Sequence, residues 1–254
     1  MNTVRVRGVE IGAGKPKIAA SVTGTDREEI LAQAAALCAL SVDVAEWRMD
    51  WFDRVDDGSA VQQCLSDLRS VLGDKVLLAT FRSEKEGGQR YLSPESYAAL
   101  NEYVISSGQA DLLDVELFSG EGIVQQLIAA AHKAGIAVVL SSHDFEKTPS
   151  KAEMVSRLCR MQELGADILK LAVMPRNRSD VLTLLQATEE MYTQHARQPL
   201  VTMSMGQLGT ITRVCGETFG SAMTFGAAAK SSAPGQMHVE ALNQALTLLS
   251  STSL

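Results

Sequence analysis

The chain has 254 residues, of which 46% are hydrophobic and 21% are charged, and its formal net charge is −7. This composition is that of an ordinary globular protein, with enough apolar material for one large domain or two small ones. A negative net charge without a dense basic cluster argues against a nucleic-acid partner. No stretch reaches the roughly 18 uninterrupted apolar residues of a membrane span, and residues 1–17 lack the apolar segment of a signal peptide. We therefore expect a cytoplasmic protein that does not contact a membrane.

The cysteines lie far apart and match no metal-ligand spacing. They are Cys38, Cys64, Cys159 and Cys215. We expect free thiols, which suit a reducing compartment, and no metal centre.

In chain order, residues 4–7 alternate apolar and charged side chains, and Gly12 and Gly14 then turn the chain, which predicts a short hairpin. Beyond it, short apolar runs alternate with amphipathic segments. The runs are typical of buried parallel strands and span residues 17–22, 43–49, 75–81, 112–117, 136–141, 166–175, 200–205 and 222–225. The amphipathic segments predict helices over residues 26–40, 60–72, 94–106, 121–134, 151–164, 179–195, 211–219 and 239–250.

This series contains eight strand-then-helix units with no linker between them, the arrangement of a (β/α)8 TIM barrel. A doubly wound open sheet is the alternative, but no GxGxxG follows the first predicted strand. We therefore predict an α/β fold, a single (β/α)8 barrel domain over residues 1–254 with a short N-terminal β-hairpin.

Lys170 lies in the middle of the apolar run 166–175, and lysine is rarely buried without a partner. In one interpretation it pairs with an acidic residue or reaches water at the end of the strand. In the other, an apolar setting lowers its pKa and leaves a neutral amine that can form a Schiff base with a carbonyl.

Alternation along the strands predicts which side chains point into the barrel. By this rule the inward polar residues are Glu46 and Arg48, Asp114 and Glu116, Ser141 and His143, and Lys170, with Ser21 and Arg82 at the ends of their strands. Charges of both signs thus meet at the C-terminal mouth, where such barrels hold their active sites. A structural salt-bridge network is the alternative, but buried charges are costly to desolvate, which favours an enzyme.

His143 is expected one strand away from Lys170 and at the same level, where an imidazole could move protons beside an iminium. His143 with Asp114 and Glu116 could alternatively bind a metal, but no second histidine is placed to help. Two loops, residues 82–88 and 226–237, are candidate lids at the mouth, or else plain surface connections.

The chain resembles the type I 3-dehydroquinate dehydratases, the Schiff-base enzymes of the shikimate pathway and thus of aromatic amino-acid biosynthesis. The matching stretches span nearly the whole chain and are residues 46–50, 80–83, 86–88, 114–118, 141–145, 165–175, 203–205 and 232–236. Ser142 departs from the pattern, where the resemblance leads us to expect asparagine.

The resemblance implies that Lys170 forms an imine with the C3 ketone of 3-dehydroquinate. His143 would be the general base and acid, and Glu86 would hold and polarise it. Arg213 would bind the substrate carboxylate. The remaining substrate-binding residues would be Ser21, Glu46, Arg48 and Arg82, joined by Ser232 and Gln236 when the last loop closes. No cofactor or metal would be needed, and the assembly would be a homodimer.

Two other functions are alternatives to this one. A class I aldolase would use the same lysine imine but break a C–C bond instead of a C–O bond. A non-catalytic binding protein would retain a sugar-acid pocket, although the presence of Lys170, His143 and Arg213 argues against a degenerate site.

Overall fold

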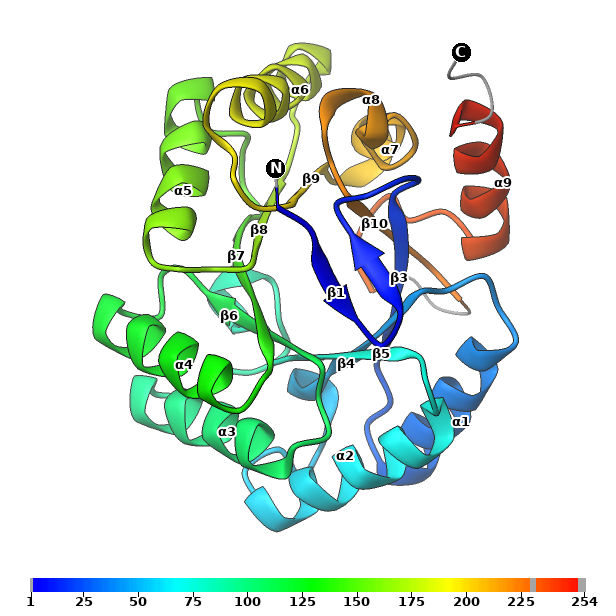
Figure 1. Cartoon of the computed structure of the whole chain (residues 1–254), viewed down its shortest axis with the longest axis vertical. Helices are drawn as coiled ribbons and strands as arrows, with labels where there is room; N and C mark the ends of the chain where they lie inside the picture. Colours follow the sequence, from blue (N-terminus) through cyan, green and yellow to red (C-terminus); the bar gives the residue numbers. More distant parts are fainter. Residues whose placement is uncertain (1, 229–231, 251–254) are drawn as a thin grey trace.

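A barrel of parallel strands forms the centre of the computed structural model, which describes residues 2–228 and 232–250 (Figure 1). Within those residues, eight strands form one sheet in the order β10-β3-β4-β5-β6-β7-β8-β9. They are β3 Lys17–Val22, β4 Val44–Arg48, β5 Val76–Thr80, β6 Leu112–Glu116, β7 Ala137–Asp144, β8 Ile168–Val173, β9 Leu200–Ser204 and β10 Met223–Gly226. The ring closes where the Leu200 carbonyl accepts a 2.7 Å hydrogen bond from the N–H of Ala222. The predicted (β/α)8 architecture is confirmed.

Helices surround the barrel and alternate with its strands (Figure 1). They are α1 Arg27–Cys38, α2 Gly58–Leu72, α3 Pro94–Ser107, α4 Glu121–Lys133, α5 Lys151–Glu163, α6 Arg178–Glu190, α7 Gly206–Val214, α8 Gly216–Phe219 and α9 Val239–Ser250. Short polar side chains begin several of them by accepting a backbone N–H bond, as Asp26 does for α1 and Ser93 does for α3. Among the described residues, no helix is both long and apolar enough to cross a membrane.

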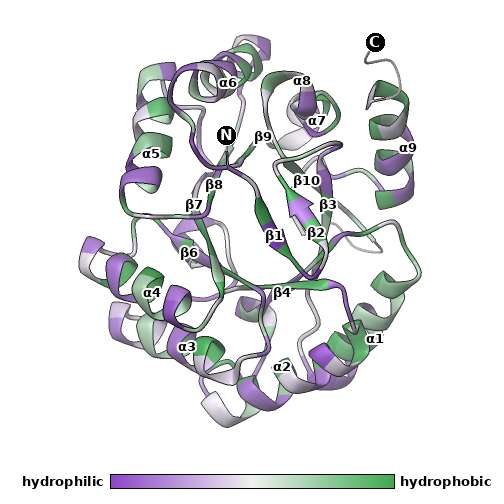
Figure 2. Cartoon of the chain, in the orientation of Figure 1, coloured by the Kyte–Doolittle hydropathy of each residue, from purple (hydrophilic) through white to green (hydrophobic). Residues whose placement is uncertain are grey.

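Apolar side chains form one layer between strands and helices and another inside the barrel. On α2 the buried residues Val61, Leu65 and Leu68 recur at helical spacing, and Figure 2 shows hydrophobic and hydrophilic residues on different sides of the surrounding helices. On β8, Leu169 belongs to the outer layer, whereas Ile168 belongs to the inner one. The alternation predicted from the sequence therefore holds.

The predicted hairpin is present, but its turn lies elsewhere. Strands β1 Val4–Val6 and β2 Val9–Ile11 pair antiparallel and are joined at Arg7 and Gly8, which both have positive φ. The expected turn at Gly12 and Gly14 follows the hairpin instead, because two consecutive residues with positive φ already make the two-residue connection between the strands. The hairpin covers one end of the barrel (Figure 1), and its Ile11 is fully buried in the inner apolar layer.

Three further predictions of element boundaries need correction. Strand β7 runs through Asp144, three residues beyond the predicted end, so His143 lies within the strand. The helix expected over 211–219 begins at Gly206 and is divided at Cys215. The helix expected over 179–195 ends at Glu190 and continues as a π-helical turn, Met191–His195. The other boundaries agree to within one or two residues.

Candidate active site

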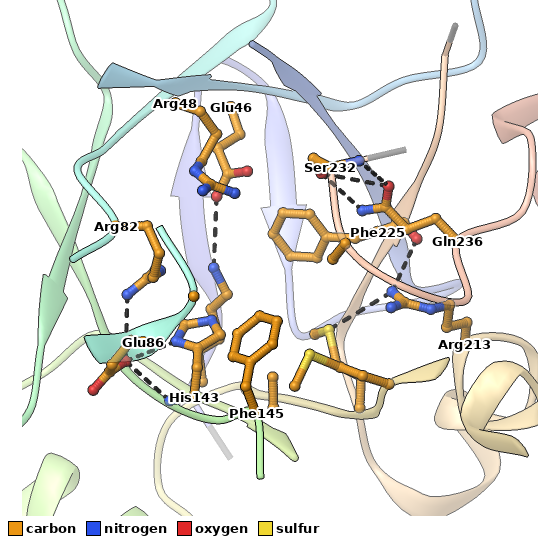
Figure 3. A pocket seen from close by; sticks show the side chains of 16 residues that line it. Glu46, Arg48, Arg82, Glu86, His143, Phe145, Arg213, Phe225, Ser232 and Gln236 are labelled. Carbon is orange, nitrogen blue, oxygen red and sulfur yellow. Dashed lines mark hydrogen bonds and ion pairs between the residues drawn. The ribbon is translucent and has the colours of Figure 1, made fainter. Parts of the chain in front are cut away.

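A cavity opens at the C-terminal ends of the strands (Figure 3). Nine of the ten residues predicted for the site line it, and they are Glu46, Arg48, Arg82, Glu86, His143, Lys170, Arg213, Ser232 and Gln236. The rest of the wall is Gly87, Phe145, Ala172, Met203, Met205, Phe225 and Ala233. Ser21 is not part of the wall, but its hydroxyl donates a 2.5 Å hydrogen bond to Glu46, so it supports the wall from behind.

Lys170 projects from β8 into this cavity and is 4% exposed. Its ammonium nitrogen lies 3.0 Å from Oδ2 of Asp114 and 3.6 Å from Oε1 of Glu46. The same nitrogen lies 4.6 Å from the centre of the Phe225 ring. Of the two interpretations of Lys170, pairing with acidic residues is the one observed, because the amine contacts carboxylates and has an aromatic face beside it.

His143 is held by Glu86 through two hydrogen bonds. Its Nδ1 lies 2.9 Å from Oε2 of Glu86, and its backbone N–H donates to the same oxygen at 3.0 Å (Figure 3). Burial lowers the pKa of His143 well below 6.5, with the positive charges of Arg82 and Lys170 adding to the effect. The imidazole is therefore neutral, with one nitrogen fixed by Glu86 and the other able to accept a proton.

The level of His143 differs from the prediction. Lys170 is paired with Ser141 across β7 and β8, whereas His143 is paired with Ala172. His143 thus lies one pleat closer to the mouth than Lys170, on the same face of the sheet. This places the neutral imidazole above the lysine amine.

Glu86 reaches His143 from a tight loop that follows β5. The loop contains a short 3-10 turn, Glu84–Glu86, and then Gly87 at φ +84°. A Cβ on Gly88 would lie 1.8 Å from the carbonyl oxygen of Arg82, so only glycine allows the loop to fold back this closely. Burial raises the pKa of Glu86 to about 8, and nearby Glu116 adds to the rise.

Arg82 lies at the centre of a buried ion cluster. Its Nη1 donates to Glu116 at 2.8 Å and to Ser141 at 3.0 Å, and its Nη2 donates to Asp114 at 2.7 Å. Although burial alone would raise the pKa of Asp114, Arg82 and Lys170 hold it below its ordinary value. Asp114 therefore stays charged and keeps Lys170 in place. The alternation rule had placed Asp114 and Glu116 inside the barrel, but it assigned them no partners.

Asp50 is a residue of the site that the sequence reasoning missed. It is fully buried and accepts two hydrogen bonds from the guanidinium of Arg48, at 2.7 and 2.8 Å. The only signal was an acidic residue two positions after an inward arginine. Because it follows the end of β4 in a turn, alternation could not place it.

Arg213 projects from α7 into the cavity and is 1% exposed. Its guanidinium donates to the carbonyl oxygens of Phe225 at 3.2 Å and Pro234 at 3.0 Å, and its buried Nε has no hydrogen-bond partner. Across residues 2–228 and 232–250, no carboxylate lies within ion-pair distance of it. Burial lowers its pKa to about 10, so the group remains charged near neutral pH. This geometry suits an anionic ligand.

Comparison with known proteins agrees with this arrangement. A model of the type I 3-dehydroquinase family matches residues 18–253. The 3-dehydroquinate dehydratase of Syntrophotalea carbinolica is 50% identical over 249 residues, covering 98% of both chains. The chain belongs to the type I 3-dehydroquinase family. Among solved structures, the Clostridium difficile enzyme with covalently modified comenic acid is 47% identical, covers 99% of both chains and has a TM-score of 0.96. The Geobacillus kaustophilus enzyme is 39% identical, covers 100% of this chain and 98% of its own, and has a TM-score of 0.97.

In this member of the family, the described part of the last loop already lies against the barrel. The hydroxyl of Ser232 donates to Ser21 on β3 at 2.9 Å, and its N–H donates to the side chain of Gln236 at 2.9 Å. Residues 229–231 of the predicted lid lie outside the described residues. The contact with Ser21 joins the loop to the side of the cavity that holds Glu46.

Ser142, the departure from the family pattern, points away from the cavity. Its hydroxyl accepts a 3.3 Å hydrogen bond from Arg157 on α5. It therefore faces the helices, while its neighbour His143 faces the cavity.

Among the described residues, no group of three His, Cys, Asp or Glu side chains is arranged to hold a metal ion. The alternative site of His143, Asp114 and Glu116 is thus not assembled.

Proposed function

We propose that this member of the type I 3-dehydroquinase family removes water from 3-dehydroquinate through an imine on Lys170, with His143 as general base and acid. The observation that carries the proposal is the meeting of a buried lysine amine and a neutral, Glu86-bound imidazole in one cavity. The guanidinium of Arg213 in the same cavity, which has no carboxylate partner among the described residues, supports an acidic substrate. The relative that contains covalently modified comenic acid supports covalent chemistry in the family.

Imine formation requires that Lys170 lose a proton before it attacks. Asp114, although bonded to the amine, is a poor acceptor because Arg82 and Lys170 keep its pKa low. We assign His143 as the acceptor, because its imidazole is unprotonated, lines the same cavity and comes from the strand next to Lys170. The free amine then attacks C3 of the ketone, and the resulting carbinolamine loses its hydroxyl as water with the proton that His143 took from the lysine. This gives a protonated imine and restores the neutral imidazole.

The imine draws electrons from the neighbouring carbon and so acidifies the C2–H bond. His143 takes that proton, the C1–O bond breaks, and the departing hydroxyl leaves as water with a proton from His143. A water molecule then hydrolyses the imine, which restores the lysine amine and releases the conjugated ketone. The net change is the loss of one water from the substrate.

The remaining residues of the cavity would bind and enclose the substrate. Arg213 would pair with the carboxylate through its planar fork. Glu46, Arg48 and Arg82 would hold the ring hydroxyls and the carboxylate region, and Ser21 would support that side. Ser232 and Gln236, which already line the cavity, would exclude water from the imine. The homodimer and the cytoplasmic location stay predictions. Light scattering after size-exclusion chromatography tests the homodimer.

Borohydride reduction in the presence of 3-dehydroquinate tests the reaction. We expect one adduct on the peptide that contains Lys170, with a mass one water below that of the intact reduced substrate when dehydration precedes trapping. Lys170→Met is the control and should give no adduct. A folded wild-type protein without an adduct would contradict the imine. An adduct whose mass corresponds to only a fragment of the substrate, left after C–C cleavage, would favour the aldolase alternative.

A further inference from the structure

Asp50 connects two parts of the cavity that lie far apart in the sequence. It lies in the short 3-10 turn Met49–Trp51, directly after β4. One of its oxygens, Oδ1, accepts bonds from Nε of Arg48 at 2.7 Å and from the backbone N–H of Arg82 at 3.3 Å. The other, Oδ2, accepts bonds from Nη2 of Arg48 at 2.8 Å and from the backbone N–H of Gln89 at 3.1 Å.

We infer that Asp50 is a positioning residue that fixes Arg48 toward the substrate and, with the same carboxylate, anchors the loop that carries Glu86. The inference rests on the proposed function, since it assigns Arg48 to the substrate and Glu86 to His143. Asp50 does not line the cavity, so it acts through these other residues.

The first contact fixes the direction of a substrate-binding group. Asp50 binds one edge of the Arg48 guanidinium, formed by Nε and Nη2, in a planar two-point contact. The donors on the opposite edge stay available to an oxygen acceptor in the cavity that Arg48 lines. A single-point contact would let the guanidinium rotate, and this two-point contact prevents that rotation.

The second contact concerns the loop. Gln89 follows Gly88, which is pressed against the end of β5, and the N–H of Gln89 points at Asp50. Glu86 lies in the same tight loop and holds His143 at 2.9 Å. A shift of the loop would therefore move the carboxylate that orients the catalytic base.

An asparagine at this position would disrupt both contacts. Every hydrogen-bond partner of the Asp50 carboxylate among the described residues is an N–H donor. The amide nitrogen of asparagine would place another donor against them, and the Arg48 charge would lose its buried counter-ion. Asp53→Asn is a matched control, because Asp53 is an exposed aspartate of the same segment that pairs with Arg90 at 3.0 Å.

The test compares steady-state turnover of 3-dehydroquinate, followed by the absorbance of the conjugated product. We expect Asp50→Asn to raise KM about tenfold and to lower kcat about tenfold, since small displacements in a positioned site are costly. Asp53→Asn should stay within about twofold of wild type in both values. In an Arg48→Met background, Asp50→Asn should leave KM unchanged, because it acts on KM through Arg48, but should still lower kcat.

Several outcomes would overturn the inference. One is an Asp50→Asn enzyme that matches Asp53→Asn in either KM or kcat. Another is an equal rise in KM in both backgrounds, which would indicate general distortion. If Asp50→Asn alone does not fold, the double variant Arg48→Met, Asp50→Asn is compared with Arg48→Met. Equal kcat values in these two enzymes would contradict the role of Asp50 in anchoring the loop that carries Glu86. An inactive wild type would contradict the proposed function itself, which separates the two failures.

Discussion

Lys170 and Arg213 line the same cavity, but they differ in their partners. The lysine amine has carboxylates at 3.0 and 3.6 Å, whereas Arg213 has backbone carbonyls and no acidic partner among the described residues. A buried charge without a counter-ion is unfavourable, so a bound anion gains most beside Arg213. Because the molecule as a whole carries a net charge of −7, we expect an acidic substrate to depend on this local cation.

Replacing Arg213 with glutamine should chiefly weaken substrate binding. Loss of a charged hydrogen-bonding partner costs about 1.5–3 kcal/mol, so we expect KM to rise roughly 10- to 100-fold while kcat changes less. The measurement is a steady-state titration with 3-dehydroquinate. Arg197→Gln is the control, because it removes the same charge from an exposed site near the N-terminal strand. A normal KM for Arg213→Gln would contradict the assignment of the carboxylate to this residue.

The neutral state of His143 leads to a prediction about pH. The base must be unprotonated to accept a proton, so the loss of activity that belongs to His143 occurs as the pH drops through its pKa in the folded enzyme. Because burial puts that pKa well below 6.5, kcat/KM should be nearly the same at pH 7 and pH 6.5 and should decline on further acidification.

A profile of kcat/KM from about pH 8 to about pH 4.5 checks this expectation, since this range extends to both sides of the ordinary histidine pKa. The exposed His195 gives the control, since His195→Gln should leave the profile unchanged. A half-maximal kcat/KM at pH 6.5 or above would show that His143 is not held in its neutral form.

At the scale of strands and loops, the part of the site that could be predicted is the part that follows regular geometry. Alternation on a strand has a period of two, so the inward side chains of β4 and β8 could be derived from the sequence alone. The vertical offset between His143 and Lys170 could not, because it depends on the register between β7 and β8. Asp50 could not be placed either, since its turn has no fixed period.

The loop that carries Ser232 and Gln236 offers a test at this scale. Gly235 has φ +79°, and a Cβ there would lie 2.2 Å from the carbonyl oxygen of Gly206, at the start of α7. We expect Gly235→Ala to push the loop off α7 and to lower kcat/KM roughly tenfold, because the cavity wall moves with it.

Gly14→Ala separates this contact from simple backbone strain. Gly14 also has a positive φ of +63°, but a Cβ there would meet no atom within 4 Å. Both variants should lose some thermal stability, while only Gly235→Ala should lose activity when kcat/KM is compared. Equal kcat/KM values in the two variants would show that docking on α7 does not matter for the site.

On the scale of the whole molecule, the cavity and the N-terminal hairpin lie at opposite ends of the barrel. The proposed catalytic groups lie at the C-terminal ends of the strands, whereas the β1–β2 hairpin covers the other end (Figure 1). Ile11 is fully buried there against residues such as Val44 and Val76, which point into the barrel. This division agrees with the general behaviour of such barrels, in which one face serves function and the other serves stability.

Ile11→Ala should therefore destabilise the protein without changing its chemistry. Removing a buried isoleucine side chain costs about 2–5 kcal/mol, so the midpoint of urea unfolding should fall while kcat and KM in buffer stay at wild-type values. Val9→Ala, in the same hairpin but only half-buried, should cause a smaller shift. If Ile11→Ala instead lowered kcat at unchanged stability, the two ends of the barrel would be coupled, and the hairpin would have to act on the site through the strands.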